Sequence, residues 1–532
     1  MIVRVAGCRR PGHAGRVTRR AATLLVLVLM TAAFPSGTWS RQLSVHPGAG
    51  DLLADVLPRA QDLVLRESGA LCTFQMDVTL DTKAGTIGGD MQVTWHNPAS
   101  QPLSEVWFRL FPNAFYYGEG GLTVDHVMVD DSPVAPELAL DDTALRVPLP
   151  GPVSPGDTAT IALDFVTTIP ADSTGSFGIF SHDTRAGSWV LADWQPQLAV
   201  WEDGSGWALP PVTSLGDPTY SPSAFYDVAV TAPDGLQVVA TGVVAAEEGG
   251  DGLVTRRFLA GPARDFVMVA TSDPAPRVRD VDGAQMRFWA PQDSSAATSD
   301  KILDIAAAAL RFYDSRFGLY PGREIDLVQT NPSGALGLAW TGLIFLDGPA
   351  LLRSYDEHNS EGLATVVTHE IGHLWWGIMV GGDSNKHAFI QEGLATVSSL
   401  LFDEATLGPE AATTQLDAWV VQPARRLLDA GDAMVDEPFQ EGEDESARSD
   451  AVYGKGSLGF LAIRQAISPE AFDAALRDIT TRYAWGEMTP EQLLAAFEDA
   501  SGQDLHALWR HWFNETGMTR EEIDGIAGTT FK

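Results

Sequence analysis

HEIGH, at residues 369–373, sets two histidines four positions apart with a glutamate directly after the first. Residues four apart on an α-helix point to nearly the same side, so His369 and His373 can offer ring nitrogens to one metal ion. Glu370 lies about 100° round the helix from His369, where it can act on water at the metal without being a ligand. On a helix this pattern is a zinc-hydrolase signature. The surrounding apolar residues keep the helical spacing of a buried face: Leu363, Val366, Val367, Ile371 and Leu374.

A third ligand is predicted from the stretch QEGLAT at residues 391–396, which opens a second apolar helical segment. A catalytic zinc usually keeps three protein ligands and one open position. We therefore predict one zinc ion per chain, bound by His369, His373 and Glu392, with Glu370 as the general base. The alternative is a buried amphipathic helix with two incidental histidines. Buried histidines need partners, however, and a metal ion supplies one.

The stretches HEIGHLWWG (369–377), QEGLA (391–395) and VYGKG (452–456) together resemble the M1 family of gluzincin metallopeptidases, best known for its aminopeptidases. The resemblance extends over roughly residues 65–520, with weaker matches in the strand-like N-terminal half. It implies a β domain followed by a thermolysin-like, mainly helical zinc domain, and it implies that Tyr453 is catalytic. The Tyr453 hydroxyl would stabilise an oxyanion; the alternative is a tyrosine packed at a helix start. We do not expect this sequence to include the helical C-terminal domain of longer family members.

One segment departs from the family pattern. The GAMEN motif of the family carries a glutamate that binds the free α-amino group of a peptide, on a strand shortly before the zinc helix. The corresponding stretch here is GLAWTGLI (337–344), which begins at Gly337 and places Ala339 where that glutamate belongs. An alanine cannot attract an ammonium group. Either the anchor is lost, or the ungapped alignment is shifted, or another carboxylate such as Glu361 reaches the site.

The β domain offers one further substrate-binding candidate. Gln197 ends the stretch WQPQ (194–197), which falls where family members line the substrate pocket from their β domain. The resemblance therefore implies that Gln197, together with Gly337 and Ala339, contacts the substrate.

Composition restricts the possible partners. The 532 residues carry a net charge of −35, which repels nucleic acid and anionic membranes. We therefore predict peptide substrates and no nucleic-acid partner. Cys8 and Cys72 are the two cysteines of the sequence, and Cys8 lies in the N-terminal leader, so no internal disulfide is expected.

Residues 1–40 have the pattern of a targeting segment. An arginine-rich start precedes Ala21 to Phe34, an apolar run of the length found in signal peptides and short for a membrane span. We predict a secreted or extracytoplasmic protein. Contact with a membrane is expected only through this segment, if it is retained uncleaved as an anchor.

The pattern of the remaining chain predicts a multidomain α/β protein. Residues 41–69 form a connector. Residues 70–291 alternate apolar and polar positions in strand after strand, typical of an antiparallel β domain. Residues 292–532 turn mainly helical and hold the zinc motif, and we interpret them as the thermolysin-like catalytic domain.

The leading hypothesis is thus an exported, aminopeptidase-like zinc peptidase that hydrolyses peptide bonds with a metal-activated water. Ala339 leaves open an endopeptidase, or a peptidase for blocked amino termini. A second alternative is a non-catalytic binding protein on the same scaffold. The intact general base and catalytic tyrosine favour an enzyme.

Overall fold

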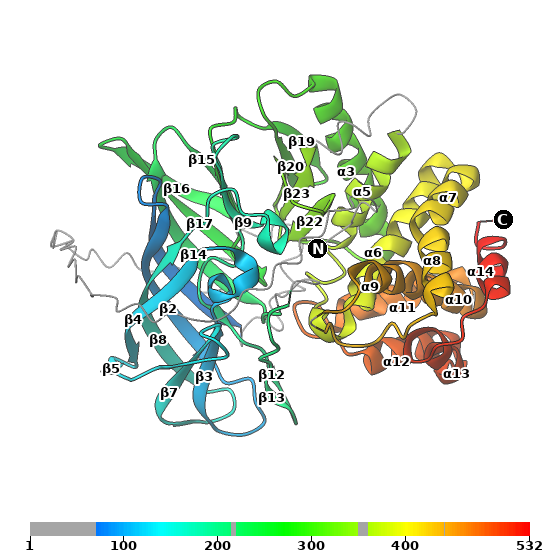
Figure 1. Cartoon of the computed structure of the whole chain (residues 1–532), viewed down its shortest axis with the longest axis horizontal. Coiled ribbons are helices and arrows are strands. Elements are labelled where there is room, and N and C mark those ends of the chain that lie inside the picture. The colour runs from blue at the N-terminus through cyan, green and yellow to red at the C-terminus, as the bar shows by residue number, and fades with distance from the viewer. Residues whose placement is uncertain (1–70, 214–219, 349–359, 441, 532) are drawn as a thin grey trace, which may run out of the picture.

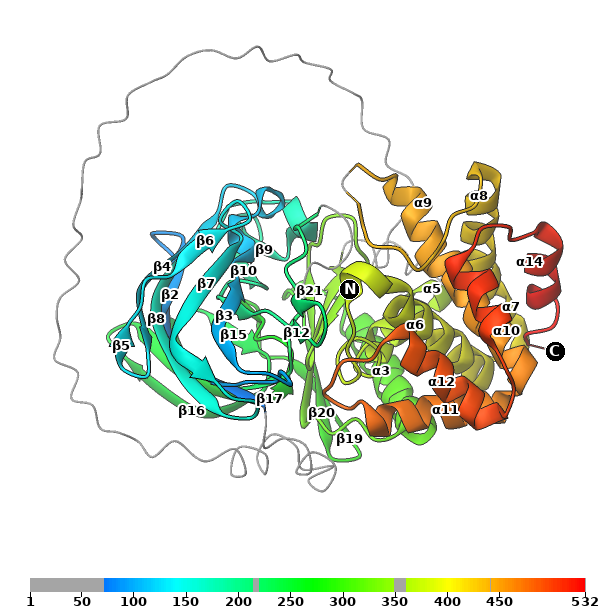
Figure 2. The ribbon, with the colours of Figure 1, turned by 90° about the horizontal axis from the view of Figure 1, so that it is seen from below.

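The computed structural model describes residues 71–213, 220–348, 360–440 and 442–531. They form a strand-rich N-terminal lobe and a mainly helical C-terminal lobe, with a sheet of the C-terminal lobe between them (Figures 1 and 2). The predicted fold class is confirmed. The leader predicted at 1–40 and the connector predicted at 41–69 lie outside the described residues.

An eight-stranded sheet organises the N-terminal lobe. Its strands alternate buried and exposed positions, as in β1, where Phe74, Met76, Val78 and Leu80 face the core. The pairing is antiparallel except between β1 and β14, which run parallel. In sheet order the strands are β16 (Val243–Gly250), β17 (Leu253–Ala263), β14 (Ala224–Pro233), β1 (Cys72–Asp81), β2 (Thr86–His96), β8 (Thr158–Thr168), β4 (Gly121–Val129) and β5 (Ser132–Pro133).

Three smaller sheets complete this lobe and share its apolar core. One has the order β15 (Gln237–Ala240), β18 (Met268–Thr271), β10 (Ser188–Leu191), β9 (Phe180–Asp183). The second has the order β11 (Gln197–Leu198), β3 (Leu103–Arg109), β7 (Ala144–Val153), β6 (Glu137–Ala139). The third pairs β12 (Trp201–Glu202) with β13 (Gly206–Trp207).

A five-stranded sheet opens the C-terminal lobe, in the order β19 (Arg277–Val281), β20 (Ala284–Trp289), β21 (Glu324–Thr330), β23 (Leu343–Asp347), β22 (Gly337–Trp340). The boundary predicted at residue 291 marks the change from strand to helix pattern. Such a pattern does not show which sheet a strand joins. β20 pairs in parallel with β21, and Met286 and Phe288 pack into the helical core. This packing unit therefore begins at β19.

The two lobes meet through a separate apolar cluster. It joins side chains of the small sheet β15–β18–β10–β9, such as Val190 and Val269, to side chains of the five-stranded sheet, such as Trp340 and Phe345. The apolar stretch 336–346 is divided at Gly342, whose φ of 68° makes a turn between β22 and β23.

Helices fill the rest of the C-terminal lobe. α3 connects the parallel strands β20 and β21, begins after the N-cap Ser295 and ends before the C-cap Gly318. Within the described residues, no helix combines the length and apolar character that a membrane span requires. The helices are α3 (Ala296–Phe317), α5 (Ser360–Gly372), α6 (Ser384–Leu407), α7 (Pro409–Leu416), η5 (Asp417–Val421), α8 (Gln422–Ala430), α9 (Glu445–Ser449), η6 (Asp450–Lys455), α10 (Gly456–Ile467), α11 (Pro469–Arg482), α12 (Pro490–Ser501), α13 (His506–Trp509), η7 (Arg510–Asn514) and α14 (Arg520–Ala527).

Candidate metal centre and adjoining pocket

Two helices bring the three predicted ligands together. α5 carries His369 in its last turn, and the His373 N–H still donates to the His369 carbonyl, so both rings project from one side. α6 begins after Asp383, whose side chain accepts hydrogen bonds from Asn385 and Lys386, and presents Glu392 towards α5. All three ligand side chains are buried.

The donor atoms have the spacing of a tetrahedral metal site. The two Nε2 atoms of His369 and His373 are 3.0 Å apart. Glu392 Oε2 lies 3.4 Å from the first and 3.5 Å from the second. Ligands held at about 2.0–2.1 Å from a tetrahedral metal are separated by about 3.3–3.4 Å. Two imidazoles and a carboxylate at these separations fit a zinc ion.

Neighbouring groups orient the histidines and set their charge. His373 Nδ1 lies 3.0 Å from the Trp376 carbonyl, an acceptor, so Nδ1 carries the proton and Nε2 keeps its lone pair for a metal. Burial and the nearby His373 lower the pKa of His369 to about 4, so its ring is neutral near pH 7. Burial raises the pKa of Glu392, but the two adjacent histidines outweigh burial and lower it to about 2.

Glu370 is placed as a base. Its side chain is fully buried, and neither carboxylate oxygen has a hydrogen-bond partner among the described residues. Burial raises its pKa, and the charge of Glu392 adds to that shift. A buried carboxyl group without a partner is costly, and a site that binds and activates water accounts for it. Gly337 on β22 lies directly against it, because a Cβ there would be 2.5 Å from Glu370 Oε1.

Tyr453 lies beside the metal ligands. It sits in η6, a π-helical stretch that runs into α10, and its ring centroid is 6.1 Å from that of His369. Gly454 allows η6 to approach α8, since a Cβ there would be 2.7 Å from the Ala424 nitrogen. The structure thus places Tyr453 next to the ligand His369, although the two residues are far apart in the sequence.

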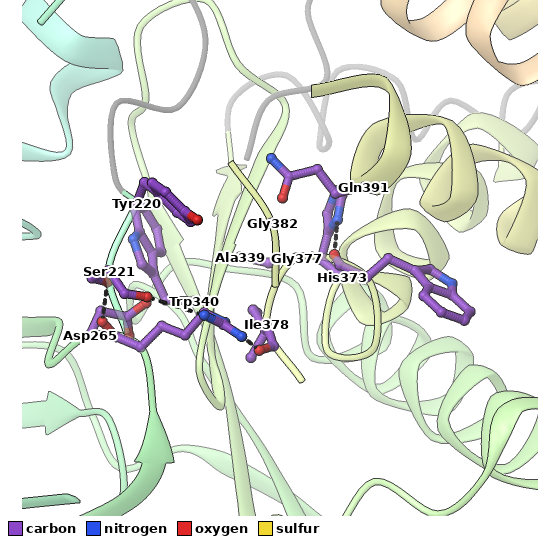
Figure 3. A pocket seen from close by; sticks show the side chains of 12 residues that line it. Tyr220, Ser221, Asp265, Ala339, Trp340, His373, Gly377, Ile378, Gly382 and Gln391 are labelled. Carbon is purple, nitrogen blue, oxygen red and sulfur yellow. Dashed lines mark hydrogen bonds between the residues drawn. The ribbon is translucent and has the colours of Figure 1, made fainter. Parts of the chain in front are cut away.

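Ala339 borders a pocket that also reaches the metal ligand His373 (Figure 3). Its side chain is buried, and its strand pairs with β23 so that Ala339 faces Ile344 across the ladder. The pocket is lined by Tyr220, Ser221, Arg264, Asp265, Ala339, Trp340, His373, Trp376, Gly377, Ile378, Gly382 and Gln391.

Sequence reasoning missed the N-terminal-lobe wall of this pocket. Tyr220 and Ser221 precede β14, whereas Arg264 and Asp265 follow β17. The sequence signal is weak: the pair Arg264-Asp265 interrupts an apolar stretch, and an unexpected charge inside such a stretch is the only hint. The side chain of Glu361, the alternative anchor, lies outside the described residues.

Gln197 is buried within the N-terminal lobe. Its Nε2 donates to Asp193 Oδ1 at 2.7 Å, and Tyr117 donates to the other Asp193 oxygen at 2.5 Å. Because a carboxylate only accepts, the Gln197 amide is fixed with its oxygen pointing away from Asp193. That oxygen has no partner among the described residues, so Gln197 can accept a hydrogen bond. Whether a substrate supplies it stays a prediction.

Comparison with known proteins agrees with this geometry. The Peptidase family M1 domain matches residues 302–512. Aminopeptidase M1-B of Oryza sativa subsp. japonica is 27% identical over 254 residues, which are 46% of this chain and 29% of that protein. Aminopeptidase N of Haemonchus contortus is 23% identical over 352 residues, 60% of this chain and 35% of that protein. The matched part therefore spans roughly a third of these relatives or less.

Solved structures share the fold. The M1 zinc metallopeptidase from Deinococcus radiodurans superposes with a TM-score of 0.60 at 18% identity, covering 84% of this chain and 94% of that one. The likeness includes both lobes, which neither curated relative covers in full. The chain therefore carries a peptidase family M1 domain at residues 302–512 and has the overall fold of M1 zinc metallopeptidases.

Proposed function

We propose that the chain is an exported, zinc-dependent peptidase that cleaves peptide bonds, with aminopeptidase-like activity. The observation that carries the proposal is the buried triangle of His369, His373 and Glu392 beside the unpartnered carboxylate of Glu370. A non-catalytic binding protein would have no use for a buried base, which costs stability unless function requires it. The variant of the Deinococcus radiodurans enzyme solved with a Tyr-Ser-Ala substrate lends support by likeness of fold.

Zinc bound at these three residues supplies Lewis-acid chemistry, acidifying water and polarising a carbonyl. Glu370 accepts the proton of the attacking water and then passes it to the departing amine. Tyr453, next to His369, donates its hydroxyl to the oxyanion of the tetrahedral intermediate. The close contact of Gly337 with Glu370 holds the base in one place.

The two candidate specificities differ in whether the enzyme binds the free amino group of the substrate. An aminopeptidase needs an acceptor for the substrate ammonium group, and Ala339 offers none to the pocket that it lines. That observation favours an endopeptidase or a peptidase for blocked amino termini as the second candidate. Asp265 also lines the pocket, and it is the carboxylate among the lining residues.

Export is proposed from residues 1–40, whose arginine-rich start and apolar run resemble a signal peptide. The segment is either removed, releasing the protein, or retained as an anchor. Amino-terminal sequencing of the protein purified from culture medium and from membranes distinguishes these outcomes.

Two measurements test the function. Metal analysis should find one zinc per chain, and a chelator should abolish peptide hydrolysis that added zinc restores. Digestion of a peptide library, with cleavage positions read by mass spectrometry, then identifies exo- or endopeptidase action. The ratio of kcat/KM for a peptide with a free amino terminus to kcat/KM for the same peptide acetylated measures the anchor. A buried charge pair is commonly worth a few kcal/mol, so an enzyme without an anchoring carboxylate should show a ratio of roughly tenfold or less. A zinc-loaded protein that hydrolyses nothing would refute the enzyme assignment.

A further inference from the structure

Arg264 lies at the junction of the two lobes, directly after β17, and its side chain is 8% exposed. Its guanidinium group donates hydrogen bonds to three backbone carbonyls and one carboxylate. Nε donates to Ile378 O at 2.6 Å, Nη1 to Ser221 O at 3.1 Å and to Glu487, and Nη2 to Gly486 O at 2.7 Å. One side chain of the N-terminal lobe thus holds two loops of the C-terminal lobe.

The first of these loops is the turn that follows the metal ligand His373. His373 Nδ1 donates to Trp376 O at the start of the turn, and Arg264 binds Ile378 O two residues later. The hydrogen bonds of this guanidinium thus reach Ser221 O in the N-terminal lobe and Ile378 O in the turn. The carbonyl that orients His373 therefore belongs to a turn fixed from the opposite lobe.

The second loop, which contains Gly486 and Met488, is hydrogen-bonded to the same turn. Gly381 N donates to Gly486 O, and Met488 N donates to Gly381 O. Gly381 rests on the guanidinium itself, because a Cβ there would lie 2.2 Å from Arg264 Cζ. No other residue type fits at 381 without displacing Arg264.

We propose that Arg264 is a positioning residue of the metal centre. By fixing the turn 376–381, it holds Trp376 O where that carbonyl keeps the proton on His373 Nδ1 and the lone pair on Nε2. The inference rests on the proposed zinc site, but not on the reaction. The planar fork of an arginine reaches these three separate carbonyls from three different nitrogens, whereas a lysine donates from a single nitrogen.

The test measures zinc affinity by competition with a chromophoric chelator on folded protein. Arg264→Lys should raise the zinc Kd about tenfold or more, the range found when groups that orient metal ligands are removed. Gly381→Ala keeps the arginine but displaces it, and should raise the Kd in the same direction. With Co²⁺ in place of zinc, both variants should shift the visible absorption bands, which report ligand geometry and do not respond to a loss of global stability.

Arg311→Lys is the matched control. Arg311 lies on α3, is 51% exposed and makes an ion pair with Asp282. The zinc Kd of the Arg311→Lys variant should therefore equal that of the unmodified protein. An unchanged Kd and unchanged Co²⁺ spectrum in folded Arg264→Lys would overturn the inference. If that variant does not fold, the same result with Gly381→Ala overturns it. An unmodified protein that binds no zinc would instead refute the proposed function, and the inference with it.

Discussion

Gly337→Ala should impair catalysis while leaving metal binding intact. A Cβ at position 337 would lie 2.5 Å from Glu370 Oε1, 2.6 Å from Cγ and 2.7 Å from Cδ, whereas an ordinary contact begins at 3.4 Å. The new methyl group must therefore displace the carboxylate by 0.7 to 0.9 Å, because the backbone of β22 is fixed by its pairing with β23. A misplacement of about 1 Å can cost a catalytic group about 10²-fold.

We expect kcat to fall about 10²-fold, with one zinc per chain retained because the three atoms nearest to the new methyl group all belong to Glu370, which is not a ligand. Overpacking should cost no more than about 1–3 kcal/mol of stability. Steady-state kinetics, metal analysis and urea unfolding measure the three quantities. Gly525→Ala is the control, since its Cβ would meet no atom within 4 Å.

A double-mutant cycle sharpens the test. In a Glu370→Gln background the base is already lost, so adding Gly337→Ala should lower the residual kcat by no more than about threefold. If the single variant Gly337→Ala keeps full kcat, the close contact does not position the base. If it loses zinc and activity together, the damage is to the ligands and the reasoning fails.

Three further outcomes are expected. Glu370→Gln should keep the zinc and lose hydrolysis by several orders of magnitude, because Glu370 is not a ligand and its role is proton transfer; metal content and rates decide. Tyr453→Phe should lower kcat by about 10²- to 10³-fold with little change in KM, because the hydroxyl acts on the oxyanion; a change confined to KM would make Tyr453 a substrate-binding residue. In the metal-free protein, unfolded His369 takes up a proton at its usual pKa of about 6.5, whereas folded His369 does so only near pH 4. The free energy of unfolding should therefore fall by about 2 kcal/mol between pH 7 and pH 5. Urea titrations that give His369→Gln the same dependence of unfolding free energy on pH would contradict this.

The proximity of His369, Glu370 and His373 could be predicted because it depends on local geometry. His369, Glu370 and His373 share one helix, and the spacing of a helix fixes which side each residue takes. Glu392 could be predicted from its place at the start of the next apolar helical segment and from the three protein ligands that a catalytic zinc usually keeps. Tyr453 needed the family resemblance, since nothing in the sequence fixes the distance between helices. The structure places Glu392 and Tyr453 beside the two histidines.

Features that depend on packing between distant segments were not predictable. β19 and β20 read as strands of the N-terminal lobe, yet Val281, Met286 and Phe288 are buried in the core of the helical lobe. The contact between Gly337 and Glu370 joins residues on different elements, and it is visible only as a distance. The sequence showed an alanine and a glycine near a motif, but not which of the two touches the base.

Ala339 shows why the chemistry of this chain is easier to read than its choice of substrate. The reacting groups come from a few helical turns. The pocket beside Ala339 is built instead from residues before β14, after β17, on β22, in the turn that follows His373 and on α6. A missing anchor at one position therefore does not decide the specificity, because Asp265 enters the same pocket from the other lobe. The comparison of free and acetylated peptides measures the assembled pocket. Repeating it with Asp265→Asn tells whether this carboxylate of the N-terminal lobe binds the substrate amino group. A preference for free amino termini that disappears in this variant assigns the anchor to Asp265, and one that persists excludes it.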